Sequence, residues 1–299
     1  MIWHRPYLAM AAFTAPARPA GSLFRIIAVL IIFEIAFAIM PQIYFGLLGP
    51  DADLSTPAAT VLDFGLFILP AAVLILAVRL LHQRGLASMI GPRNLALQQT
   101  VVATLAVSLV LLAQEPALLW FDLSEDLGLR NPALWLVWLL PGLVAITIQC
   151  ATEELLYRGY LQQQLGALSS SRWVWMVLPS VYFGFGHLYN GDTVAAGVLW
   201  AGWATLLGLA CADLTARTGT LGAAVGLHVA NNVFATVIIA EAQTPSSGLA
   251  LLLYPYAGDL PPDDAGLMAL LTPFTLFDIV VSVMGVLVMW LAARVALRV

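Results

Sequence analysis

The chain has 299 residues, of which 61% are hydrophobic and 10% are charged, and its mean hydropathy is +0.93. This composition excludes a soluble globular domain and predicts an all-α, polytopic integral membrane protein, with room for about eight spans of ~20 residues. The formal net charge of -5 gives no reason to expect a nucleic-acid partner, and we expect the lipid bilayer to surround the chain. Cys150 and Cys211 both lie in apolar segments, where we expect small buried side chains and not a disulfide or a metal pair.

The predicted elements follow one another from a short basic segment into a single helical domain. Residues 1–21 contain arginines and prolines and are expected to form an irregular, cytoplasmic N-terminal segment. Residues 22–299 are expected to form one transmembrane domain, with a polar, proline-rich loop at 241–271. Its eight predicted spans cover residues 22–48, 57–81, 99–120, 132–169, 172–189, 194–214, 220–240 and 273–293. The fourth is longer than a bilayer is thick, so its last turns should emerge as an amphipathic extension.

The arginines support this arrangement, since the chain has no lysine and its arginines fall almost entirely in alternate loops. Arg130 lies on one side of the predicted membrane and Arg158 within it. The other ten lie on the opposite side: Arg5, Arg18, Arg25, Arg79, Arg84, Arg93, Arg172, Arg217, Arg294 and Arg298. By the positive-inside rule, this asymmetry predicts that both termini are cytoplasmic. We expect a multi-pass protein of a bacterial inner membrane.

Polar side chains inside the fourth, fifth and seventh predicted spans are the candidate functional residues. A charged side chain at the bilayer centre costs about 2.5–3.5 kcal/mol on insertion scales, so its default interpretation is functional. At 1.5 Å per residue, these side chains fall roughly 13–22 Å from the cytoplasmic ends of their spans, and they can converge. They are Glu153, Glu154 and Arg158 in the fourth span, His187 in the fifth, and His228, Asn231 and Asn232 in the seventh.

Spacing within each helix assigns neighbours to these residues. Glu154 and Arg158 are four residues apart and are expected to pair on one face, which leaves Glu153 free to meet His187 across the helix interface. A carboxylate in poorly solvated surroundings accepts a proton from water near neutral pH, and a histidine within reach can orient that water. A second histidine and an amide, such as His228 and Asn232, can donate hydrogen bonds to a developing oxyanion. No serine or cysteine lies in an obvious nucleophile setting, which argues against an acyl-enzyme.

Three motifs in this order resemble the signature of the CAAX protease and bacteriocin-processing (CPBP) family of intramembrane proteases. They are Glu153-Glu154-x-x-x-Arg158, Phe183-x-x-x-His187 and His228-x-x-x-Asn232, and the detailed resemblance covers about residues 134–240. The resemblance implies hydrolysis of a peptide bond within or at the membrane. It further implies that Glu153 and His187 activate water and that His228 and Asn232 stabilise the oxyanion. Glu154 and Arg158 would then have supporting roles, while Phe183 packs around the site and Asn231 is an alternative for the last motif position.

The resemblance also implies a substrate class, which is a peptide or membrane protein, in some family members with a C-terminal lipid. The favoured mechanism, in which Glu153 and His187 activate water, requires no cofactor. Glu153, His187 and His228 nevertheless match the ligand inventory of a catalytic zinc site, so a divalent metal is the alternative, although the chain has no His-Glu-x-x-His run.

Other functions fit the same scaffold. A non-enzymatic interaction or immunity protein is one alternative. In addition, the Glu154–Arg158 pair can have a purely structural role. A proton-coupled transporter is a further alternative. The absence of an inverted repeat in the sequence argues against it.

Overall fold

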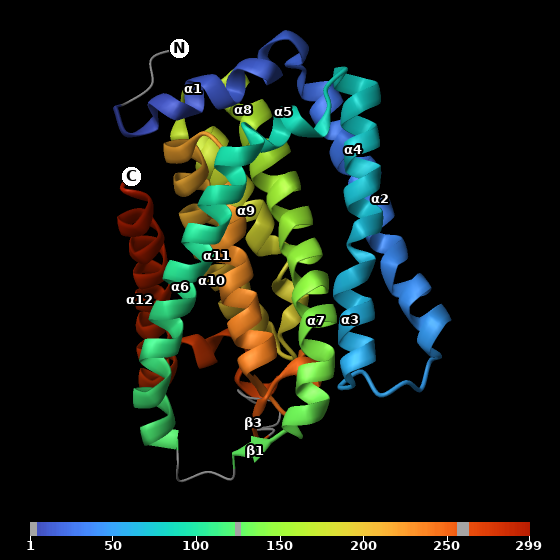
Figure 1. Cartoon of the computed structure of the whole chain (residues 1–299), viewed down its shortest axis with the longest axis vertical. Helices are drawn as coiled ribbons and strands as arrows, with labels where there is room; N and C mark the ends of the chain where they lie inside the picture. Colours follow the sequence, from blue (N-terminus) through green and yellow to red (C-terminus); the bar gives the residue numbers. More distant parts are fainter. Residues whose placement is uncertain (1–4, 123–126, 256–262) are drawn as a thin grey trace.

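The computed structural model describes residues 5–122, 127–255 and 263–299, which form a bundle of long helices (Figure 1). Six helices in these residues are long and apolar enough to cross a membrane. They are α2 (Leu23–Leu48), Pro57–His82, Arg93–Gln114 of α6 (Arg93–Asp122), Pro132–Leu168, α10 (Val194–Thr218) and α12 (Pro273–Leu297). The second consists of α3 (Pro57–Leu66) and α4 (Ile68–His82). The predicted all-α membrane fold is confirmed.

The segments predicted as the fifth and seventh spans are shorter than the other six. The fifth consists of the π-helix η4 (Trp173–Val177) and α9 (Leu178–Phe185), and the seventh of α11 (Gly222–Val233) and the π-helix η6 (Phe234–Ile238). The fifth was predicted to reach residue 189, but α9 ends at Phe185 and the chain turns into η5 (Leu188–Asn190). Eight spans is therefore an approximate count.

The fourth predicted span is one continuous helix over Pro132–Leu168, close to its predicted range. It begins where the Asn131 side chain accepts hydrogen bonds from the backbone of Ala133 and Leu134, with Pro132 in the first turn. Its geometry changes from α7 (Pro132–Glu154) to the π-helix η3 (Leu155–Gln162), and α8 (Gln163–Leu168) completes it. The π-turns thus start directly after Glu154, and π-turns inside α-helices are frequent at functional sites.

Glycines on one face of α11 allow it to pack very close to α6, and this packing fixes the direction of the opposite face. A Cβ atom at Gly222 would lie 2.0 Å from the carbonyl oxygen of Ala96, and one at Gly226 would lie 2.5 Å from that of Thr100. His228 lies two residues beyond Gly226, which is about 200° around the helix. The glycine face therefore turns His228 away from α6 and towards α7.

The N-terminal segment is helical and packed, which corrects the expectation that it is irregular. It forms η1 (Arg5–Tyr7), α1 (Leu8–Thr14) and η2 (Ala15–Ala20), and it crosses one end of the bundle near the short helix α5 (Leu86–Ile90) (Figure 1). Met10 and Phe13 are buried. The Tyr7 hydroxyl donates to Asp213 Oδ1 at 2.7 Å, and Trp290 Nε1 donates to Asp213 Oδ2 at 2.8 Å. These bonds tie the segment to α10 and α12.

A small sheet lies at the opposite end of the bundle, where the sequence predicted loops and, at residues 239–240, the end of the seventh span. Its strand order is β1-β3-β2, from β1 (Gly128–Leu129), β3 (Leu252–Tyr254) and β2 (Ile239–Glu241). β1 pairs with β3 antiparallel, and β2 pairs with β3 parallel. The predicted 241–271 loop also contains η7 (Pro245–Leu249) and η8 (Asp263–Leu271).

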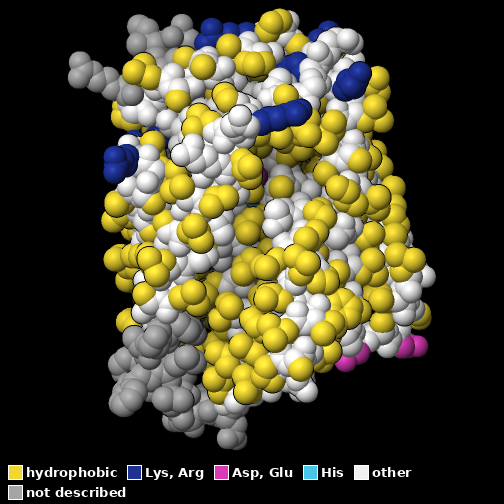
Figure 2. All heavy atoms as spheres, viewed as in Figure 1, with side chains coloured by type: hydrophobic (Ala, Val, Ile, Leu, Met, Phe, Trp, Pro, Cys, Tyr) yellow, Lys and Arg dark blue, Asp and Glu magenta, His cyan; other side chains and the backbone are white. Residues whose placement is uncertain are grey.

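The outer surface is that of a multi-pass membrane protein. Large apolar side chains cover the sides of the bundle, including Phe24 and Phe274, each 81% exposed. On the face shown in Figure 2, arginine side chains gather at the end that carries α1, and acidic side chains lie at the other end. The helix bundle and its polar ends agree with the predicted arrangement, while the cytoplasmic location of the termini stays a prediction.

Candidate active site

An ion pair between Glu154 and Arg158 lies at the centre of the bundle. Arg158 Nη1 donates to Glu154 Oε1 at 2.9 Å, and both side chains are almost completely buried, so the predicted pair is confirmed. The Arg158 guanidinium also lies over the Phe183 ring, 4.8 Å from its centroid. Gly208 of α10 makes room for it, because a Cβ atom there would lie 2.9 Å from Arg158 Nη2.

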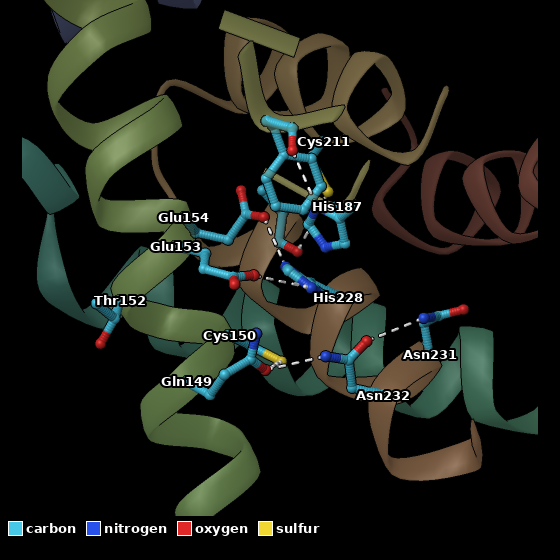
Figure 3. A network of polar contacts seen from close by, with 12 residues as sticks. Gln149, Cys150, Thr152, Glu153, Glu154, His187, Cys211, His228, Asn231 and Asn232 are labelled. Atoms are coloured by element: carbon cyan, nitrogen blue, oxygen red, sulfur yellow. Dashed lines mark hydrogen bonds and ion pairs between the residues drawn. The ribbon is translucent and has the colours of Figure 1, made fainter. Parts of the chain in front are cut away.

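His228 lies between the two adjacent glutamates of α7. Its Nδ1 donates to Glu154 Oε1 at 2.8 Å, and its Nε2 lies 3.5 Å from Glu153 Oε2 (Figure 3). The His228 side chain is 2% exposed. A carboxylate that accepts from one imidazole nitrogen holds the tautomer and stabilises the protonated ring. Arg158, Glu154, His228 and Glu153 therefore form one chain of polar contacts.

Glu153 contacts His228, whereas the sequence led us to expect His187 as its neighbour. The Glu153 side chain is 14% exposed, unlike that of Glu154, which is fully buried. His187 follows the end of α9, and its Nδ1 bonds to the carbonyl oxygen of Phe183 at 2.9 Å. That bond holds the ring against its own helix. Glu153 and His187 therefore make no direct contact, although both line the same cavity.

The Phe183 ring packs against both histidines. Its centroid lies 4.6 Å from that of His187 and 5.8 Å from that of His228, with edge-to-face geometry in both cases. Phe183 is 1% exposed. This placement agrees with the expected packing role and fixes the spacing between the imidazoles.

Two asparagines and one glutamine form a second polar network one turn away. Asn231 Nδ2 donates to Asn232 Oδ1 at 3.0 Å, and Asn232 Nδ2 donates to Gln149 Oε1 at 2.9 Å (Figure 3). The Cys150 thiol donates to the same Gln149 oxygen at 3.2 Å. Gln149 is not among the candidate residues predicted from the sequence. Its spacing of four residues before Glu153, on the same helix face, was the available signal.

A cavity of about 880 Å³ gathers most of these residues on its wall. Glu153, His187, His228, Asn231, Asn232 and Gln149 line it. Apolar and aromatic side chains from α2–α4 and α10 form other parts of the wall, among them Phe37, Tyr44, Phe64, Phe67, Trp200 and Trp203. Glu154, Arg158 and Phe183 do not line the cavity. The site thus has one layer of residues that line the cavity and a second layer behind it that supports them.

The proposed metal ligands do not gather around one point. Among the residues that the structure describes, no group of three or more His, Cys, Asp or Glu side chains is arranged to hold a metal ion. Glu153 and His228 are neighbours, while His187 bonds to the backbone of its own helix. As arranged, Glu153, His187 and His228 do not fit a zinc ion, and independence from metal stays a prediction.

Comparison with known proteins supports the resemblance found in the motifs. Residues 133–234 match the family model described as type II CAAX prenyl endopeptidase Rce1-like. This segment runs from the start of α7 to the end of α11, and it contains the glutamates, both cavity histidines and both asparagines. The predicted resemblance to CAAX proteases is confirmed for this part of the chain, which is thereby similar to a family of hydrolases.

A relative in a bacterium covers more of the chain. The uncharacterized protein YyaK of Bacillus subtilis (strain 168) is 28% identical over 229 residues, which are 74% of this chain and 75% of that protein. No solved structure matches. The bacterial relative agrees with the expected bacterial origin.

Proposed function

We propose that this protein is an intramembrane endopeptidase in which Glu153 and His187 activate the water that hydrolyses a peptide bond. The observation that carries the proposal is the cavity wall, to which Glu153, His187, His228 and Asn232 all contribute. The match of residues 133–234 to a prenyl endopeptidase family supports the same reaction class. The cavity of about 880 Å³ has the size of a small-molecule or peptide site.

The contacts of His187 suit it to orient a water molecule by accepting a hydrogen bond from it. Because the Phe183 carbonyl oxygen can only accept a hydrogen bond, Nδ1 of His187 carries the hydrogen in their 2.9 Å contact. In the neutral ring, Nε2 then holds a lone pair. A water between this nitrogen and the Glu153 carboxylate would lose a proton to Glu153 as its oxygen bonds to the scissile carbonyl carbon.

His228 and Asn232 suit the negative charge that this attack creates. The carbonyl π electrons move to oxygen, and the resulting oxyanion needs hydrogen-bond donors. Glu154 holds the His228 ring through Nδ1, so a proton carried on Nε2 during the reaction would be donated to the oxyanion, and Asn232 supplies an amide N–H. When the tetrahedral intermediate collapses, the C–N bond breaks, and the proton held by Glu153 passes to the leaving amine.

The cavity also suggests the class of substrate. Its aromatic walls on α2–α4 and α10 favour an apolar segment beside the scissile bond. We propose a peptide or membrane-protein substrate, including one with a C-terminal lipid. The arginine asymmetry supports cytoplasmic termini, and the bacterial relative supports a bacterial inner membrane.

Cleavage by the purified protein tests this function. The protein would be reconstituted in phospholipid vesicles and incubated with a farnesylated CAAX-type peptide and with the same peptide unmodified, and the fragments would be identified by mass spectrometry. Glu153→Gln, His187→Ala and His228→Ala should each lower kcat by about 10²–10⁴-fold, which is the range of general-base and oxyanion contributions. Asp51→Asn, an exposed acid outside the cavity, is the matched control.

Each outcome has a defined meaning. Cleavage that persists in one of the three variants would remove the role assigned to that residue. If the unmutated protein cleaves neither peptide, and the variants keep the cellular phenotype, a non-enzymatic interaction protein is the better description. Loss of activity on chelation, restored by zinc, would favour the metal alternative.

A further inference from the structure

Gln149 holds a place in the cavity wall that none of the three motifs assigns. It lies on α7 one turn before Glu153, and it is 6% exposed. Its Oε1 accepts from Asn232 Nδ2 at 2.9 Å and from the Cys150 thiol at 3.2 Å. The side chain therefore connects α7 to α11 at the level of the proposed oxyanion donors.

The amide of Asn232 is held at both of its polar atoms. Its Oδ1 accepts from Asn231, and one hydrogen of its Nδ2 goes to Gln149. An amide nitrogen carries two hydrogens, so one N–H remains for the cavity that Asn232 lines. Without Gln149, only the bond from Asn231 would orient the group, and the amide plane could rotate about the last side-chain torsion.

We propose that Gln149 is a positioning residue, which aims the free N–H of Asn232 at the oxyanion. This inference rests on the proposed peptidase function. Gln149 and Glu153 lie on the same face of α7, one turn apart. This helix therefore carries both the proposed base, Glu153, and the acceptor, Gln149, that holds the oxyanion donor Asn232. The distance between base and donor is thus set by one rigid helix, and catalytic groups need that kind of placement within about 0.5 Å.

A double-mutant cycle between Gln149 and Asn232 tests the proposal in reconstituted vesicles. Asn232→Ala should lower kcat by about 10²–10³-fold, as for one oxyanion donor. Gln149→Met keeps the length of the side chain and removes the acceptor. It should lower kcat about 10–100-fold on the same scale, and leave KM within about threefold. The double variant should be within about threefold of Asn232→Ala alone, because Gln149 acts only through Asn232.

A tetrahedral inhibitor separates positioning from a purely structural role. The affinity for a peptide phosphinate should fall in Gln149→Met by the same factor as kcat/KM, while KM for the peptide changes little. Gln162→Met is the matched control, since Gln162 is a buried glutamine of the same long helix whose Nε2 donates to the Ala212 carbonyl at 2.9 Å, away from the cavity. It should lower the melting temperature and keep kcat within about twofold.

The outcomes distinguish this inference from the function on which it rests. Absence of cleavage by the unmutated protein would overturn both. Cleavage by the unmutated protein together with unchanged kcat in Gln149→Met, or multiplicative losses in the double variant, would overturn the role of Gln149 alone. If Gln149→Met does not fold, Gln149→Asn replaces it. That amide is one methylene too short to reach Asn232, and wild-type kcat in this variant would equally overturn the proposal.

Discussion

His228 donates from Nδ1 to Oε1 of Glu154 at 2.8 Å, and this contact joins α11 to α7 behind the cavity wall. The same carboxylate oxygen accepts from Arg158 at 2.9 Å. Glu154 therefore neutralises a buried guanidinium and orients an imidazole at once. The expected division between a supporting Glu154 and an accessible Glu153 agrees with these contacts, although catalysis by Glu153 stays a prediction.

Glu154→Gln should destabilise the protein strongly. Removing one partner of a buried ion pair costs about 3–5 kcal/mol, because Arg158 would keep an uncompensated charge. We expect a clear fall in the melting temperature in detergent. The double variant Glu154→Gln/Arg158→Met should recover much of that loss, and no recovery would show that the charge of Arg158 is not the cause.

Phe183→Leu should lower both stability and activity. The smaller side chain removes the ring that spaces the imidazoles of His187 and His228 and that faces the Arg158 guanidinium. Phe185→Leu is the matched control on the same helix, because Phe185 is 59% exposed and Phe183 is 1% exposed. Thermal unfolding and kcat would be measured for both, and equal effects of the two changes would contradict the role of Phe183.

Gly208→Ala should disturb the buried ion pair through packing alone. The new methyl group would lie 2.9 Å from Arg158 Nη2 and 3.1 Å from the Cβ atom of Ser180. Overpacking of this kind costs about 1–3 kcal/mol, which thermal unfolding would detect. Gly202→Ala, also in α10, places its methyl group in open space and should not lower stability.

Tyr7→Phe should loosen the N-terminal segment. The loss of its hydrogen bond to Asp213 should cost about 1 kcal/mol, and proteolysis within residues 5–20 should become faster. Tyr189→Phe is the control, since Tyr189 is 94% exposed. Unchanged proteolysis in Tyr7→Phe would show that the hydroxyl does not hold the segment.

The same hydroxyl predicts a dependence on alkaline pH. Burial, and then the hydrogen bond to Asp213, raises the pKa of Tyr7 above its ordinary value of 10.0. A raised pKa means that the fold favours the neutral phenol. Its contribution to stability is therefore complete below pH 10 and is lost as the pH rises through the raised pKa. The melting temperature should fall less steeply above pH 10 in Tyr7→Phe than in the unmutated protein.

Residue spacing predicted those parts of the site that depend on one helix or on depth. The Glu154–Arg158 pair follows from a separation of four residues, and the approach of His228 to the glutamates follows from its depth in the seventh span. The contact of Glu153 with His228, and not with His187, could not be predicted from residue spacing. It depends on where α9 ends and on the bond that Nδ1 of His187 makes to its own helix. Helix periodicity contains no information on either.

Other features depend on contacts between segments far apart in the chain. Spacing places Gln149 on the helix face of Glu153, but its contact with Asn232 depends on the position of α11. The first 20 residues contain prolines that suggest an irregular segment, yet burial of Met10 and Phe13 stabilises them as helix. The strands β1, β2 and β3 are two or three residues long, too short for any alternation of polar and apolar residues to identify them.

The shortness of the helix that precedes His187 has a consequence for the surrounding lipid. η4 and α9 contain 5 and 8 residues and together extend about 20 Å, whereas the hydrocarbon core of a bilayer is about 30 Å thick. The chain therefore leaves helical geometry within that thickness. Non-helical backbone at such depth is tolerated only inside protein or beside hydrated space. Here Gly186, His187 and Asn190 line the cavity, and their N–H groups donate to the carbonyl oxygens of Tyr182, Gly184 and His187. Hydrophobic mismatch at α9 therefore predicts local thinning of the bilayer, which would shorten the path from the aqueous phase to the proposed site.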